Sequence, residues 1–123
     1  MNLNWEKLCA IASKEIEATL EALPKPLRMH AAKLPVTFES RPSVGLQADG
    51  IVLDTLGLFT GAEFIDEEAI PMPPQIILFL ENIWEFADDD ENLFRDEVHT
   101  TFLHELGHYL GLDEDDLTDR GLK

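Results

Sequence analysis

The sequence predicts a single α+β domain spanning residues 1–123, with helices at both ends and a small mixed sheet between them. Three observations support this fold class. Apolar residues recur every three or four positions in the first part of the chain, as in an amphipathic helix. Short apolar runs bounded by glycine and proline occupy the middle, and a helical pattern follows Asp88-Asp89-Asp90.

The first predicted element is an amphipathic helix over residues 5–23. Its apolar side chains lie three or four positions apart, with charged side chains largely between them. Asn4 suits the N-cap position and Pro24 stops the helix, after which we expect a short helical turn within residues 25–34. The recurring apolar residues are Leu8, Ala12, Ile16, Leu20 and Leu23.

The middle of the chain predicts the strands of the sheet. Residues 36–39 alternate inward and outward, as in a half-buried strand. Residues 51–53 and 56–59 predict one or two strands with a tight turn, and the acidic, proline-rich residues 66–74 predict a surface loop. Residues 76–80 are almost all apolar, so we expect a strand that is buried on both faces or covered on one by a helix.

The long helix near the C-terminus is expected to start at Asp88-Asp89-Asp90, because carboxylates complement the positive end of the helix dipole. Gly111 is a natural residue just past the end of this helix. A last short segment follows, with one turn of helix expected through Leu117. The long helix carries the residues whose chemistry points to a function.

The charge of the chain excludes several kinds of partner. It has 9 Lys+Arg against 25 Asp+Glu, which gives a formal net charge of −16 at pH 7. Residues 1–41 sum to +1, whereas residues 42–123 sum to −17. A field of this sign repels phosphate backbones and anionic membrane surfaces, so we expect neither nucleic acid nor a membrane as a partner. The longest apolar run is also far shorter than the roughly 20 residues that cross a bilayer.

The N-terminus and the cysteine content predict a cytoplasmic protein. Residues Met1 to Asn4 contain neither the basic region nor the apolar stretch of a signal peptide. Cys9 is the only cysteine of the sequence, so no internal disulfide can form. A chain without disulfides suits a reducing compartment such as the cytosol.

The strongest functional signal is His104-Glu105-Leu106-Gly107-His108, an H-E-x-x-H pattern within the long helix. Histidines four residues apart are separated by about 40° around a helix, so both rings can converge on one zinc ion at about 2.0–2.1 Å. Glu105 lies about 100° round from His104, where it can reach a water bound to that ion and act as a base.

A third ligand is predicted just beyond the helix. Gly111 allows the chain to turn back, and a six-residue step from His108 reaches Glu114. Carboxylates are ordinary zinc ligands, and two histidines with one carboxylate leave a fourth position for water, as in catalytic zinc sites. The alternatives to Glu114 in the same acidic run are Asp113, Asp115 and Asp116.

Neighbouring polar residues have simpler interpretations. His99 lies about 140° from His104 around the helix, so we expect it to face elsewhere. Tyr109 is expected in the core rather than as an oxyanion donor. Glu97 either accepts a hydrogen bond from a ring of the site or stays solvated. A metal-free interpretation also remains, in which His104 and His108 interact only with the negative end of the helix dipole and nearby carboxylates.

Residues 98–117 resemble the active-site helix of zincin metallopeptidases, and the whole chain is similar to small, single-domain bacterial zincin-like proteins. The resemblance rests on His104-Glu105-x-x-His108-x-x-Gly111 followed by acidic residues, the pattern HExxHxxGxx[D/E]. In that family the position of Glu114 is commonly Asp. The resemblance implies a minimal zincin core, one zinc-like ion and peptidase activity.

Together these features predict metal-assisted hydrolysis of peptide bonds in a peptide or protein substrate. One zinc ion per chain, held by His104, His108 and Glu114, would activate water, with Glu105 as the general base. We expect the strand at 76–80 to be the edge on which an extended substrate pairs. The alternative is a non-catalytic metal-binding or protein-interaction domain that keeps the zincin core.

Overall fold

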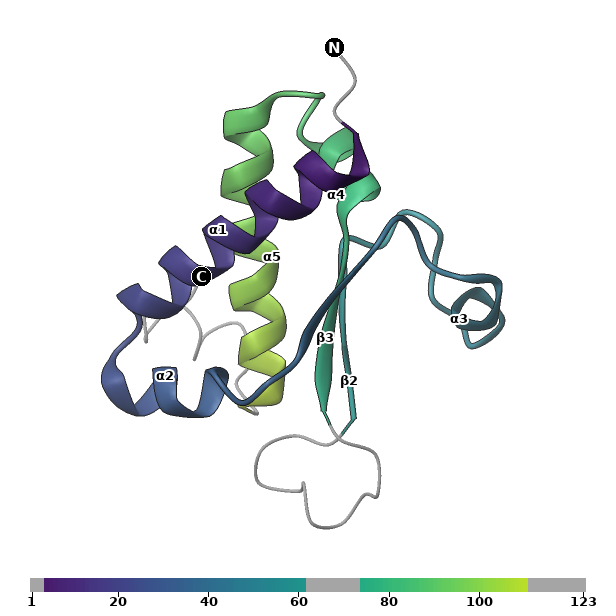
Figure 1. Cartoon of the computed structure of the whole chain (residues 1–123). Coiled ribbons are helices and arrows are strands. Elements are labelled where there is room, and N and C mark those ends of the chain that lie inside the picture. The colour runs from purple at the N-terminus through teal and green to yellow at the C-terminus, as the bar shows by residue number, and fades with distance from the viewer. Residues whose placement is uncertain (1–3, 62–73, 111–123) are drawn as a thin grey trace.

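The computed structural model describes residues 4–61 and 74–110 (Figure 1), and these ranges contain helices together with a small mixed sheet. The α+β class predicted from the sequence is therefore confirmed. No helix in the described ranges is both long enough and apolar enough to cross a membrane. The elements in chain order are α1 (Trp5–Ala22), α2 (Lys25–Ala31), β1 (Val36–Glu39), α3 (Val44–Ala48), β2 (Gly57–Thr60), β3 (Gln75–Phe79), α4 (Leu80–Phe86) and α5 (Glu91–Tyr109).

The N-terminal helices follow the predicted pattern. The side chain of Asn4 caps α1 by accepting a hydrogen bond of 2.8 Å from the backbone N–H of Lys7. The apolar face of α1 is buried through Leu8, Ala12 and Ile16. The short helical turn expected after Pro24 is α2, in which a proline occupies one of the first helical positions without loss of a needed N–H.

The sheet has the strand order β1-β3-β2, with β1 parallel and β2 antiparallel to β3. Strand β3 therefore lies in the middle, and its residues from Ile76 to Phe79 are all buried. The predicted burial of this strand is confirmed, whereas its expected role as a sheet edge is wrong. Residues 51–53 form no strand, because Val52 and Leu53 are exposed and the chain turns there.

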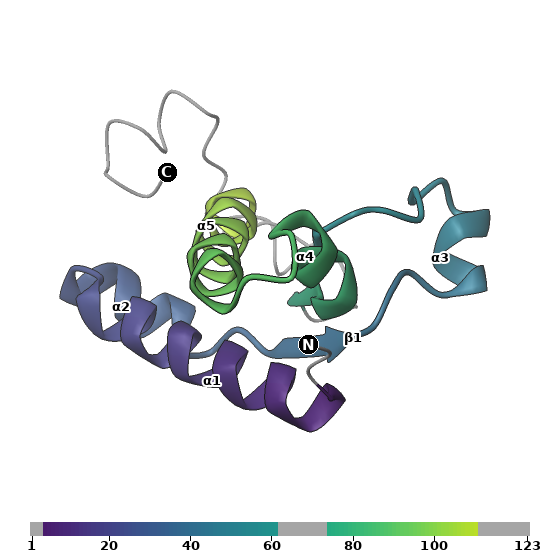
Figure 2. The same cartoon turned by 90° about the horizontal axis from the view of Figure 1, so that it is seen from above.

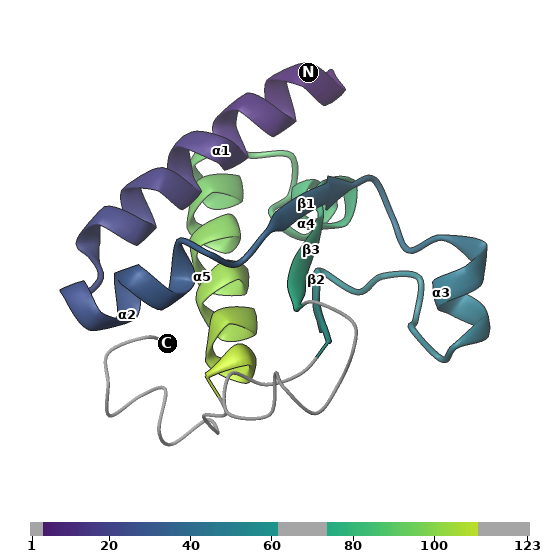
Figure 3. The same cartoon turned by 60° about the horizontal axis from the view of Figure 1, so that its bottom comes forward.

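Two short helices were not predicted. Helix α3 begins after Ser43, whose Oγ accepts a hydrogen bond of 3.2 Å from the backbone N–H of Leu46. None of its residues is buried, and it lies apart from the other helices in Figures 1 and 3. Helix α4 follows β3 without a loop, so Leu80, which the sequence assigned to the strand, is already helical. Helices this short offer too few turns for a clear apolar periodicity.

The connection from α4 to α5 explains where the long helix begins. Asp88 and Asp89 have φ angles of 56° and 59°, a left-handed conformation that Asp tolerates better than most residues. Asp90 is the N-cap, and its side chain accepts a hydrogen bond of 2.9 Å from the backbone N–H of Leu93. The three aspartates thus form a turn and a cap rather than the first helical residues.

Three other predictions concern residues that the structure does not describe. They are the loop at 66–74, of which only Pro74 is described, Gly111, and the segment through Leu117.

Helix α5 is the central element of the domain. It contacts α1 and α4 as well as strands β2 and β3. In Figures 1 and 3 α1 crosses α5, and the sheet runs alongside α5. Figure 2 shows α4 beside α5 from above. Phe94, Val98, Phe102 and Leu106 of α5 are almost completely buried in the shared core. This packing places the C-terminal half of α5 next to β2.

Candidate metal centre

The two histidines of the H-E-x-x-H motif face each other from consecutive turns of α5. Their Nε2 atoms are 3.2 Å apart, and the ring planes meet at 79° with centroids 4.8 Å apart. Two nitrogens bound to one tetrahedral zinc ion at the usual length lie about 3.3 Å apart. The separation of the two Nε2 atoms is therefore close to that of two zinc-bound nitrogens. The same spacing also allows one ring to donate a hydrogen bond to the other.

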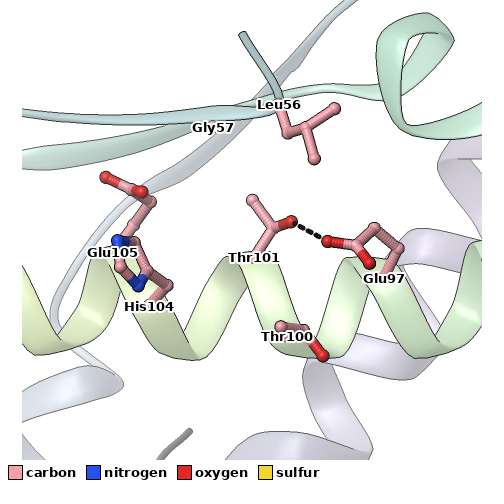
Figure 4. Close-up of a pocket in the computed structure, with 7 residues that line it drawn as sticks. All are labelled: Leu56, Gly57, Glu97, Thr100, Thr101, His104 and Glu105. Atoms are coloured by element: carbon pink, nitrogen blue, oxygen red, sulfur yellow. Dashed lines mark hydrogen bonds between the residues drawn. The ribbon is translucent and has the colours of Figure 1, made fainter. Parts of the chain in front are cut away.

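Glu105 completes a cluster with these rings. One ligand atom from each of His104, Glu105 and His108 lies within 4.8 Å of the others, so the three residues could hold a metal ion. Glu105 is half-buried, and in Figure 4 its carboxylate extends from α5 toward β2. Burial raises the pKa of the Glu105 carboxyl above its ordinary value of 4.5. The charges of His108 and His104 and a hydrogen bond with the backbone of Phe59 partly offset this rise in pKa.

Among the described strands β2 is one of the two edge strands of the sheet, and this edge lies next to the cluster. The carbonyl of Leu56 accepts a hydrogen bond of 2.9 Å from the backbone N–H of Phe79 in β3. The backbone groups of Leu56 therefore point toward β3. Because hydrogen-bonding directions alternate along an antiparallel strand, the backbone groups of Gly57 and Phe59 point away from β3. The edge next to the motif thus belongs to β2, not to the strand at 76–80.

Gly57 allows β2 to lie this close to α5. A Cβ atom at this position would be 2.6 Å from Cγ2 of Thr101 and 3.3 Å from Cγ of Glu105. Real side chains do not tolerate the first of these distances, so a larger residue would push the strand and the helix apart. Sequence reasoning missed the role of Gly57. The available signal was an isolated glycine inside an apolar strand, which often marks a close approach of backbone.

Two hollows flank Glu105 along the junction of β2 and α5. The first has a volume of about 330 Å³ and the second about 380 Å³. Glu105 lines both, so it lies between two spaces that a bound chain could fill on either side. The first, drawn in Figure 4, is lined by Leu56, Gly57, Glu97, Thr100, Thr101, His104 and Glu105. The second is lined by Leu58, Phe59, Gly61, Glu105 and His108.

The other polar candidates on α5 have separate roles. Nδ1 of His99 is 2.8 Å from Oγ1 of Thr19 on α1, so His99 joins two helices away from the motif. The single hydroxyl hydrogen of Thr19 goes to the carbonyl of Glu15, which makes His99 the donor of this bond. Tyr109 is buried and packs against the ring of Phe59, with centroids 5.8 Å apart. His99 thus contacts α1 rather than the motif, and Tyr109 lies in the core, as predicted.

The expected third ligand belongs to a part of the chain that the structure does not describe. Glu114 and Gly111 lie outside the described residues, as do the three alternatives in the acidic run. The described part of the motif therefore consists of two imidazoles and the carboxylate of Glu105. The three alternatives are Asp113, Asp115 and Asp116.

Comparison with known families adds an independent finding. The family model described as zincin-like metallopeptidase matches residues 31–122. This range runs from the end of α2 through the whole sheet and the motif on α5. No curated protein matches the chain. Zincin-like proteins bind a metal, typically zinc, which agrees with the donor atoms that His104 and His108 bring together.

Proposed function

The chain belongs to the zincin-like metallopeptidase family, and on that premise we propose that it hydrolyses peptide bonds with one zinc ion held by His104, His108 and Glu114. The observation that carries this proposal is the 3.2 Å separation of the two Nε2 atoms with Glu105 beside them. We include Glu114 as a ligand because it lies six residues after His108 and because carboxylates are ordinary zinc ligands.

Zinc in this position would supply Lewis acidity and would lower the pKa of water at the site to about 7. The protein supplies the proton transfers. Glu105 accepts a proton from the water while the water oxygen forms a bond to the carbonyl carbon of the substrate. The same carboxyl then returns the proton to the amine nitrogen as the carbon–nitrogen bond breaks. Its half-buried position between two hollows supports this role.

The edge of β2 that faces away from β3 suits an extended peptide, because no other described strand pairs with it. Backbone groups on an unpaired edge can add one more strand, and the edge at Gly57 lies directly beside Glu105. A peptide paired there would place the bond to be cleaved near the carboxyl of Glu105. Side chains on either side of that bond would then enter the two hollows. This arrangement replaces the one expected from the sequence, in which β3 was the pairing edge.

The decisive experiment compares wild type with Glu105→Gln after both have been loaded with zinc. We expect hydrolysis of a diverse peptide library, measured as newly formed amino groups, to fall by about 10²–10⁴-fold. The zinc content should stay the same, because the proposed ligands are unchanged. Asp96→Asn is the matched control, since Asp96 is exposed on the same helix. Equal rates for wild type and Glu105→Gln would remove Glu105 from the mechanism.

The third ligand needs its own measurement. We expect Glu114→Ala to lower zinc affinity, measured by competition with a chelating dye, more than alanine at any neighbouring acidic position. A larger loss at Asp113, Asp115 or Asp116 would move the ligand to that residue. Stoichiometric zinc without hydrolysis of any library peptide would instead favour the alternative of a non-catalytic metal-binding or protein-interaction domain.

A further inference from the structure

The hollow that contains Glu97 runs along α5 away from the metal centre. In Figure 4 Glu105 and His104 lie at one end, Glu97 lies at the other, and Thr101 lies between them with Leu56 opposite. Glu97 and Glu105 are eight residues apart, which corresponds to about 12 Å along the helix axis. The volume of about 330 Å³ is at the lower end of the range for ligand sites, about 300–1,000 Å³. The hollow is thus large enough for a long amino-acid side chain.

The middle of this hollow is apolar. Gly57 contributes no side chain, and Leu56 and the methyl group of Thr101 line the space between the two carboxylates. A side chain that extends from Glu105 to Glu97 lies against these groups. Aliphatic stems pack well on such a surface, whereas a short polar side chain would leave it unfilled.

Glu97 ends the hollow with a carboxylate that has acceptor capacity to spare. Its Oε1 accepts a hydrogen bond of 3.2 Å from Oγ1 of the buried Thr101, which restricts its orientation. Among the described residues, Glu97 has no further hydrogen bond and no ion pair. A carboxylate in a half-enclosed space binds cationic donors best, and a planar guanidinium can contact both of its oxygens.

We infer that this hollow selects substrates with a lysine or arginine side chain next to the cleaved bond, and that Glu97 is the specificity-determining residue. The inference rests on the proposed peptidase function. Lysine and arginine have an aliphatic stem that ends in a cationic head. The stem would lie against the apolar middle of the hollow, and the head would reach the carboxylate of Glu97. The net charge of −16 adds a field that attracts such substrates.

A binding experiment tests the hollow without relying on catalysis. The full chain labelled with ¹⁵N is titrated with n-butylguanidinium and with its neutral counterpart n-butylurea, and amide shifts are followed by NMR. We expect n-butylguanidinium to shift the amides of Gly57, Thr100 and Thr101, and to bind about tenfold more tightly than the urea. Glu97→Gln, which keeps an oxygen to accept from Thr101, should abolish this preference. Asp96→Asn removes the same charge from the neighbouring residue and should preserve it.

Equal binding of the two probes, or an unchanged preference in Glu97→Gln, would overturn the inference. A second measurement compares kcat/KM for peptides that differ only in Lys, Leu or Glu beside the cleaved bond. We expect wild type to favour Lys by about tenfold and Glu97→Gln to lose this preference. Hydrolysis without preference would reject the role of Glu97 and leave the peptidase function standing. Selective guanidinium binding without any hydrolysis would reject the peptidase function and leave the cation preference of the hollow standing.

Discussion

The protein contains two polar clusters that differ in how their hydrogen-bonding groups are used. The first surrounds Asn82, which is buried at 3% exposure on α4. Its Nδ2 donates to the carbonyls of Leu53 at 2.7 Å and Thr55 at 2.9 Å, and its Oδ1 accepts from Arg41 at 2.6 Å. Arg41 in turn pairs with Glu85 at 2.8 Å. Every donor and acceptor of the Asn82 side chain thus has a partner within the protein.

The second cluster, at His104, Glu105 and His108, is arranged in the opposite way. One possible metal-ligand atom from each residue lies within 4.8 Å of the others, and hollows open on both sides of Glu105. The closed cluster attaches the chain before β2 to α4, so its polarity stabilises the fold. The open cluster could hold a metal ion and lies beside two hollows, which is why the proposed function assigns chemistry to it. Burial and closure of the hydrogen bonds distinguish the structural cluster at Asn82 from the cluster to which we assign a function.

The largest expected effect tests the open cluster. His108→Ala removes one of two facing imidazoles, and we expect zinc affinity to fall by at least about 100-fold, together with any thermal stabilisation by zinc. His99→Ala is the matched control, because it removes a histidine of the same helix that bonds to Thr19 instead. That variant should lose about 1 kcal/mol of unfolding free energy and keep its zinc. Comparable zinc content in both variants would contradict the proposed site.

The next effect tests the closed cluster. Asn82→Ala removes a buried side chain and leaves two part-buried carbonyls and one guanidinium group without this partner, so we expect a loss of about 3 kcal/mol in the free energy of unfolding. Zinc affinity of the folded protein should be unchanged, since Asn82 lies outside the motif. Thr37→Ala removes only an exposed bond of 3.4 Å to Gln75 and should cost far less in the same urea titration. A stable Asn82→Ala with weakened zinc binding would reverse the roles assigned to the two clusters.

The smallest effect tests how the open cluster is positioned. Gly57→Ala places a methyl group against Cγ2 of Thr101, and we expect a loss of about 1–2 kcal/mol in unfolding free energy with a displaced Glu105. Thr101→Ser removes the methyl group that would be struck, so the double variant should lose less than the two single variants together. Gly45→Ala is the control, because a Cβ there meets only Oγ of Ser43 at 3.8 Å. Additive losses in the double-mutant cycle would show that β2 and α5 do not meet through Gly57.

Features that depend on neighbours along the chain could be predicted. The amphipathic pattern and Asn4 predicted α1, and the alternation of residues 36–39 predicted β1, since helix and strand periodicities are local. The same reasoning missed α3 and α4, which are too short to show a period. It also assigned residues 51–53 to a strand because they are apolar, although no neighbouring strand pairs with them in the described structure.

The sequence by itself determined that His104 and His108 stand on one face of a helix, because a four-residue step returns nearly to the same direction on any α-helix. Only the tertiary structure decided what lies opposite that face. Among the described strands, the strand order placed β3 in the middle and β2 at an edge. Close packing at Gly57 brought that edge to Glu105, and Glu97 became the end of a hollow. These relations join residues that are far apart in the chain, and they follow from pairing and packing that no local pattern encodes.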